Sequence, residues 1–150
     1  MSIEQATRLR KTIDQASIKL KQITASLAKI KETPDRWSKQ EILGHLIDSA
    51  ANNHHKFVRT ATAPGGHLEF VGYAQNQWVA VQNYQEMNWP ELIEFWYTYN
   101  RHLVRLMENL PASTHLHTIS IDQQEPLTLE FIMHDYNDHL EHHLSQIFHP

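Results

Sequence analysis

Helical periodicity is the feature that most constrains this chain, because apolar residues recur every three or four positions through four long segments. In the first segment they fall at Leu9, Ile13, Ala16, Leu20, Ile23, Leu27 and Ile30. This spacing gathers the apolar side chains on one face of a helix, and that face must be buried against other helices. The sequence therefore predicts an all-α protein.

Boundary signals delimit the four segments at about residues 2–33, 38–60, 88–110 and 128–148. Ser2 and Ser38 are each followed three positions later by Gln or Glu, the pattern of a capping box. Thr128 is suited to cap the fourth helix. Pro34 and Pro111 end the first and third helices, because proline cannot continue a helix.

The connections define the topology. The stretch "ATAPGGHLEF" contains turn formers, and residues 76–87 form a weaker helical pattern that Asn76 could cap, which we expect across the bundle end. Residues 115–129 alternate and are β-branched, which predicts a short extended arm or small hairpin before the last helix. We expect one domain, residues 1–150, folded as a four-helix bundle with a long crossover between its second and third helices.

Composition excludes several classes of function. The net charge of -4 argues against a nucleic-acid partner, and no apolar run reaches the roughly 18 residues that a membrane span needs. The polar start "MSIEQATRLRKTID" is unlike a signal peptide, so we expect a cytoplasmic protein. The absence of cysteine removes disulfides, thiolate metal sites and a nucleophilic thiol of the chain's own.

Histidine is the unusual residue, with 12 in 150 positions. His139 and His143 lie on the core side of the fourth helix, one turn apart, where two imidazoles can reach one cation. About one His-x-x-x-His pair is expected by chance at this composition, so orientation rather than spacing carries the argument. His45 lies on the apolar flank of the second helix, and three inward histidines with open water positions would describe a catalytic metal site.

The remaining histidines fit surface or loop positions. His134 and His142 point away from the core and His149 is terminal; the others are His54, His55, His67, His102, His115 and His117. The metalloprotease pattern His-Glu-x-x-His fails because Leu140 follows His139, and the di-iron Glu-x-x-His pattern fails because Leu144 lies three residues after Glu141.

Two motifs resemble the DinB-like superfamily of four-helix-bundle proteins. "RWSKQEILGHLIDSA" is similar to its second-helix signature and "HLEHHLSQI" to its closing His-x-x-x-His-x-x-Gln-Ile signature, and "YAQNQWVAVQNYQEMNWPELIEFWYTYNRHL" resembles the middle of the family. The resemblance implies that His45, His139 and His143 hold a divalent metal, usually zinc, nickel or iron, with waters completing the shell. It also implies a homodimer. Family members include thiol S-transferases, a mycothiol-dependent isomerase and proteins described as metal-dependent hydrolases.

Two classes of function follow. The first is a metal-dependent enzyme acting on a small molecule, either transferring a low-molecular-weight thiol as a cosubstrate or hydrolysing a bond with metal-bound hydroxide. The second is a non-catalytic metal-binding or stress-response protein whose site is structural or vestigial. DNA-damage binding would rest on the family's name alone. Residues that could orient a ligand are Asp48, Asp135, Asp138 and Gln146, and aromatics that line either a pocket or the core are Trp37, Trp78, Trp96 and Tyr136.

Overall fold

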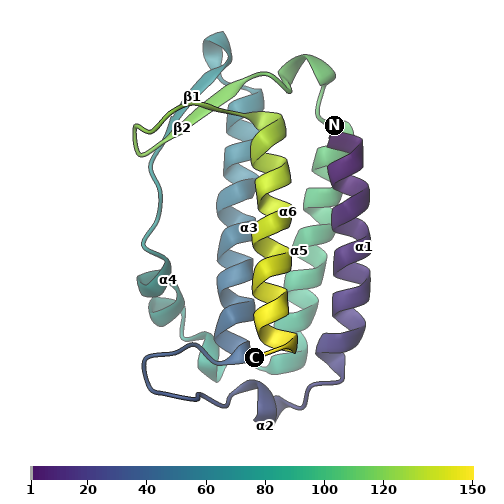
Figure 1. The fold of residues 1–150 in the computed structure, drawn as a ribbon, viewed down its shortest axis with the longest axis vertical. Coiled ribbons are helices and arrows are strands. Elements are labelled where there is room, and N and C mark those ends of the chain that lie inside the picture. Colours follow the sequence, from purple (N-terminus) through teal and green to yellow (C-terminus); the bar gives the residue numbers. More distant parts are fainter. Residues whose placement is uncertain (1) are drawn as a thin grey trace.

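Four long helices lie side by side in the computed structural model, which describes residues 2–150 (Figure 1). They are α1 (Ser2–Lys21), α3 (Lys39–Ala61), α5 (Trp89–Asn109) and α6 (Leu129–Phe148). Around the bundle, α1 packs on α5 and α6, and α3 packs on the same two helices. Because a long crossover separates α3 from α5, these two run in the same direction (Figure 1). The predicted four-helix bundle is confirmed.

The core lies between the four helices and is built from their apolar faces. Side chains that are fully buried include Leu9, Ile13, Leu43, Phe57, Leu92, Trp96, Leu103 and Leu140. The capping box predicted at Ser38 is present, with Ser38 Oγ accepting from the Glu41 amide and Glu41 accepting from the Ser38 amide. Asn88 and Thr128 cap α5 and α6. Across residues 2–150, no helix is both long and apolar enough to span a membrane.

The connections add a small sheet at one end of the bundle (Figure 1). It consists of β1 (His67–Phe70), β2 (Thr118–Ile121) and β3 (Leu127–Thr128). The predicted hairpin corresponds to β2 and β3, which pair antiparallel. The parallel pairing of β1 with β2 ties the crossover to the segment before α6; it joins residues about 50 positions apart and has no local sequence signal.

The first helix is shorter than predicted. It ends at Lys21, and a separate turn, α2 (Ala25–Ala28), follows because Thr24 Oγ1 accepts from the Leu27 amide and starts a new helix. Ile30 lies outside both helices and is exposed. The expected capping box at Ser2 is also wrong, since Ser2 is already helical and Gln5 Oε1 accepts instead from Asn137.

The crossover helix differs from expectation in its cap and its place. α4 (Gln75–Gln82) begins before Asn76, and its N-cap Ala74 provides no side-chain hydrogen bond. It packs against the side of α3 rather than across the bundle end (Figure 1). His115, which was expected at the surface or in a loop, lies in a loop. It follows the short 3₁₀ turn Ala112–Thr114 but is buried.

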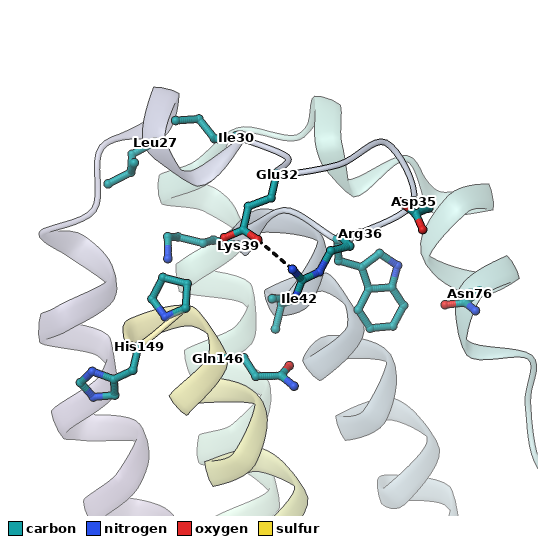
Figure 2. A pocket seen from close by; sticks show the side chains of 12 residues that line it. Leu27, Ile30, Glu32, Asp35, Arg36, Lys39, Ile42, Asn76, Gln146 and His149 are labelled. Atoms are coloured by element: carbon teal, nitrogen blue, oxygen red, sulfur yellow. Dashed lines mark hydrogen bonds and ion pairs between the residues drawn. The ribbon is translucent and has the colours of Figure 1, made fainter.

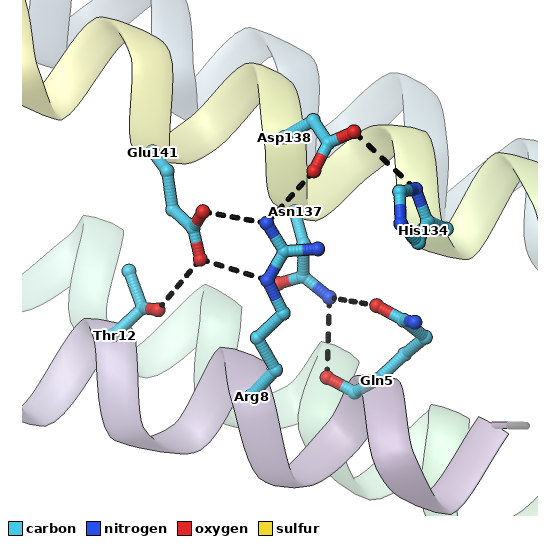
Figure 3. A network of polar contacts seen from close by, with 7 residues as sticks. All are labelled: Gln5, Arg8, Thr12, His134, Asn137, Asp138 and Glu141. Atoms are coloured by element: carbon cyan, nitrogen blue, oxygen red, sulfur yellow. Dashed lines mark hydrogen bonds and ion pairs between the residues drawn. The ribbon is translucent and has the colours of Figure 1, made fainter.

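A polar network between α1 and α6 fixes these two helices against each other (Figure 3). Arg8 donates from Nη2 to Asp138 at 2.7 Å and from Nε to Glu141 at 2.9 Å. These contacts hold the pKa of the Arg8 guanidinium above its usual value, mainly through the Glu141 hydrogen bond. With Asp138 and Glu141 held toward α1, His139 and His143 face α3.

Candidate metal centre

The structure brings the three predicted ligands together from two helices. His45 lies two turns into α3 and is fully buried, whereas His139 and His143 lie one turn apart on α6 and are half-buried. One nitrogen from each ring can be chosen so that all three lie within 4.8 Å of one another. Neighbouring α3 and α6 therefore place three imidazoles around one point.

The mutual geometry of the rings fits coordination of one cation. Ring centroids are 4.5 Å apart for His139 and His143, 4.8 Å for His45 and His143, and 5.2 Å for His45 and His139. The Nε2 atoms of His45 and His139 lie 3.4 Å apart. When both rings carry their proton on Nδ1, two lone pairs face each other there, and a shared cation removes that repulsion.

Neighbouring polar groups orient two of the rings. The Nδ1–H of His143 donates to Gln146 Oε1 at 2.9 Å, which leaves Nε2 with a lone pair for a metal. Nδ1 of His139 lies 3.5 Å from Ser49 Oγ, a contact at the outer limit of a hydrogen bond. Nδ1 of His45 is buried and finds no partner within residues 2–150.

All three imidazoles are held neutral. Burial, followed by the neighbouring His143 and His139, lowers the pKa of His45 to about 3. Burial, followed by His143, lowers the pKa of His139 to about 4, and burial also lowers that of His143. Neutral imidazole is the form that binds metal, so protons compete little for these nitrogens at neutral pH.

Of the four residues considered for orienting a ligand, only Gln146 touches a triad ring in the described part of the chain. Asp138 is paired with Arg8 on the α1 side. Asp48, one turn after His45, is buried and accepts at Oδ1 from Tyr84 at 2.6 Å and from Gln82 at 2.7 Å. Burial raises its pKa. Asp48 thus fastens the crossover to α3.

Ser49 is the neighbouring residue that the sequence argument missed. It stands four positions after His45, on the same side of α3, so helical spacing could have singled it out. Its hydroxyl also accepts from Asn53 at 3.3 Å, which restricts its orientation toward His139.

A pocket of about 580 Å³ lies at the end of the bundle where α6 finishes (Figure 2). Two of its lining residues also meet the triad: the Trp37 ring centroid lies 4.9 Å from that of His45, and Gln146 holds His143. Ile42 and Asn76 line it from α3 and α4. None of the three histidines lines this pocket, so Trp37 and Gln146 connect the pocket to the centre.

The histidine cluster offers three candidate ligands and no fourth in the part of the chain that the structure describes. Nitrogen donors suit zinc, nickel and iron rather than magnesium or calcium. Three protein ligands that leave coordination positions open are typical of catalytic rather than structural metal sites. The arrangement thus fits a divalent metal with exchangeable positions.

Comparisons with known proteins agree with this architecture. A family model described as the DinB superfamily matches residues 7–147. YfiT from Bacillus subtilis, described as a probable metal-dependent hydrolase with an unusual four-helix bundle topology, superposes with a TM-score of 0.80 at 20% identity over 97% of this chain and 85% of its own. No curated protein sequence matches the chain.

A mycothiol-dependent maleylpyruvate isomerase has the same fold. It superposes with a TM-score of 0.79 at 13% identity over 98% of this chain. The match spans 60% of the isomerase, so that protein has a large part with no counterpart here. At these identities the two solved structures establish a shared fold, and the chemistry depends on the residues of this chain.

Proposed function

Because the chain belongs to the DinB superfamily, we propose that it is a divalent-metal-dependent enzyme whose metal is held by His45, His139 and His143. The reaction we propose is transfer of a low-molecular-weight thiol to a small electrophile. Hydrolysis is the second candidate, favoured by the description of YfiT as a probable metal-dependent hydrolase. In both cases the substrate is a small molecule.

The observation that carries this proposal is a set of three candidate ligands without a fourth within residues 2–150. A structural site is closed by four protein ligands, whereas the described residues offer three, two of them half-exposed. A pocket lined by Trp37 and Gln146, which contact the rings of His45 and His143, could receive a small molecule near this point. These features favour an enzyme over a vestigial or purely structural metal site.

The chain's residues have distinct parts in this proposal. A divalent metal bound by the triad would lower the pKa of a thiol or water and so supply a nucleophile at neutral pH. His45, fully buried against Trp37, excludes water from one side. Gln146 and Ser49 hold the rings of His143 and His139 in the orientation that coordination needs.

Thiol transfer by this chain would use an external thiol, because the chain has no Cys in 150 residues. The structurally similar isomerase named above is described as mycothiol-dependent. We further propose a cytoplasmic homodimer, the expectation drawn from the family resemblance. Light scattering of the purified protein tests the dimer directly.

Elemental analysis tests the metal. Wild-type protein should contain about one zinc, nickel or iron per chain, and the His139→Ala, His143→Ala double variant should lose it while its far-UV circular dichroism stays helical. His134→Ala is the matched control, because His134 is an exposed histidine on the same helix. No bound metal in wild type, even after incubation with these ions, would refute the triad.

Activity assays then separate the two reactions. Metal-loaded protein should conjugate mycothiol or bacillithiol to 1-chloro-2,4-dinitrobenzene, and the double variant should not. Release of nitrophenol from p-nitrophenyl acetate without thiol would instead favour hydrolysis. A metal-replete protein inactive in both assays over a broad panel of thiols and esters would favour the non-catalytic alternative.

A further inference from the structure

A second pair of histidines meets on another side of the bundle. His54 on α3 and His102 on α5 have ring centroids 5.1 Å apart and ring planes at 79°. The pairs within the triad span 4.5 to 5.2 Å and 71 to 76°. The new pair therefore has nearly the mutual geometry of the candidate ligands.

This pair is independent of the triad. His54 follows His45 by nine positions, which is two and a half helical turns, so the two rings leave opposite faces of α3. His45 faces α6, whereas His54 faces α5. His54 is half-buried and His102 exposed, so an ion can reach both rings from solvent.

Tyr99 orients His54 for coordination. The Tyr99 hydroxyl lies 2.9 Å from Nδ1 of His54. When Nδ1–H donates to the hydroxyl oxygen, Nε2 keeps its lone pair for a metal, the same relation that Gln146 has to His143. Burial, then His102 and His55, lowers the pKa of His54 and keeps its ring neutral.

We propose that His54 and His102 form a second divalent-cation site, in which the two imidazoles bind one zinc, nickel or copper ion and water fills the remaining positions. The donors select this class of ion, because imidazole nitrogen suits late first-row metals whereas magnesium and calcium prefer oxygen. His55 borders the site, with its ring centroid 6.1 Å from that of His54. Arg101, next to His102 in the sequence, lies over the Tyr97 ring.

The site would be weaker than the triad, since it has two protein ligands instead of three and is more exposed. Its affinities should follow the general order for nitrogen sites, with copper bound most tightly and manganese least. By connecting α3 to α5, a bound ion would also stabilise the bundle, because only the folded chain brings the two rings together.

Zinc titration by calorimetry tests the proposal. Wild type should take up two zinc ions per chain in two affinity classes. The His54→Ala, His102→Ala variant should lose the weaker class, with affinity reduced at least tenfold, and keep the stronger one. The His139→Ala, His143→Ala variant should show the reverse. His67→Ala, which removes an exposed histidine from the sheet, should change neither class.

Copper identifies the ligands directly. Electron paramagnetic resonance of the His139→Ala, His143→Ala variant with one copper per chain should show coupling to imidazole nitrogens, which disappears when His54 and His102 are also replaced. The proposal is overturned if the weaker zinc class is absent from wild type or survives unchanged in the His54→Ala, His102→Ala variant. Failure of the triad would remove only the stronger class, so the two hypotheses fail separately.

Discussion

Gly44→Ala should destabilise the protein although it replaces glycine in the middle of a helix. A β-carbon at Gly44 would lie 2.2 Å from Cδ2 and 2.3 Å from Cγ of Tyr84. Tyr84 is buried, so its ring cannot turn aside into solvent. Its hydroxyl donates to Asp48 at 2.6 Å, and displacing the ring would also break this hydrogen bond to a buried carboxylate.

The expected change in the free energy of unfolding combines one stabilising contribution with two destabilising ones. Helix propensity favours alanine over glycine by about 1 kcal/mol. Overpacking a filled site costs about 1–3 kcal/mol, and losing a hydrogen bond to a charged group costs about 1.5–3 kcal/mol. Gly44→Ala should therefore lower the free energy of unfolding by about 1.5–5 kcal/mol, or the unfolding midpoint by roughly 3–20 °C.

Urea unfolding with a chelator present measures this effect without a contribution from bound metal. A double-mutant cycle with Tyr84→Ala isolates the cause. Tyr84→Ala alone should cost about 3–5 kcal/mol, as large-to-small replacements of buried aromatics do. In that background Gly44→Ala should become neutral or stabilising, because the obstructing ring is gone. A Gly44→Ala variant as stable as wild type, or equally destabilised in both backgrounds, would refute the reasoning.

Three further predictions concern single polar contacts. Gln146→Ala should weaken metal binding about tenfold by freeing the His143 ring, measured by competition with a chromophoric chelator, and Gln146→Glu should retain binding because it keeps the acceptor. Arg8→Ala should cost only about 0.5–1 kcal/mol, and less in high salt, since Arg8 and Glu141 are partly exposed; an unchanged cost at 1 M salt would contradict the ionic origin. Burial raises the pKa of Asp48, so its ionisation costs stability progressively as the pH rises above the ordinary carboxyl range. Asp48→Asn should therefore gain stability relative to wild type between pH 4 and pH 8, and a constant difference in urea unfolding across that range would argue against it.

The four long helices and the inward pair His139 and His143 were predictable because each depends on spacing within one segment. His139 and His143 lie between Tyr136 and Ile147 on the stripe of α6, and the structure places both toward the interior. His45 could be chosen on the apolar flank of α3 without knowing which helix it would meet. Only the fold shows that α6 supplies the other two rings.

Features that join distant segments were not predictable in the same way. The apolar period of the first helix continues through Leu27, so nothing in the pattern marks the end at Lys21. Thr24 starts a new turn there, and the Trp89 indole N–H donates to the Ile23 carbonyl at 3.0 Å, holding the break in place. The break after Lys21 therefore depends in part on Trp89, which lies 66 residues beyond Ile23 in the sequence.

Asp48 and Ser49 show why closeness in sequence does not decide which residues assist a metal ligand. They follow His45 by three and four positions, so their side chains leave α3 on either side of it, at about -60° and +40° around the helix. Ser49 meets His139 on α6, whereas Asp48 is held by Tyr84 and Gln82 of the crossover. The element that packs against each side of α3 thus determines what Ser49 and Asp48 do. His45 consequently lies on α3 between the side that meets α6 and the side that meets the crossover.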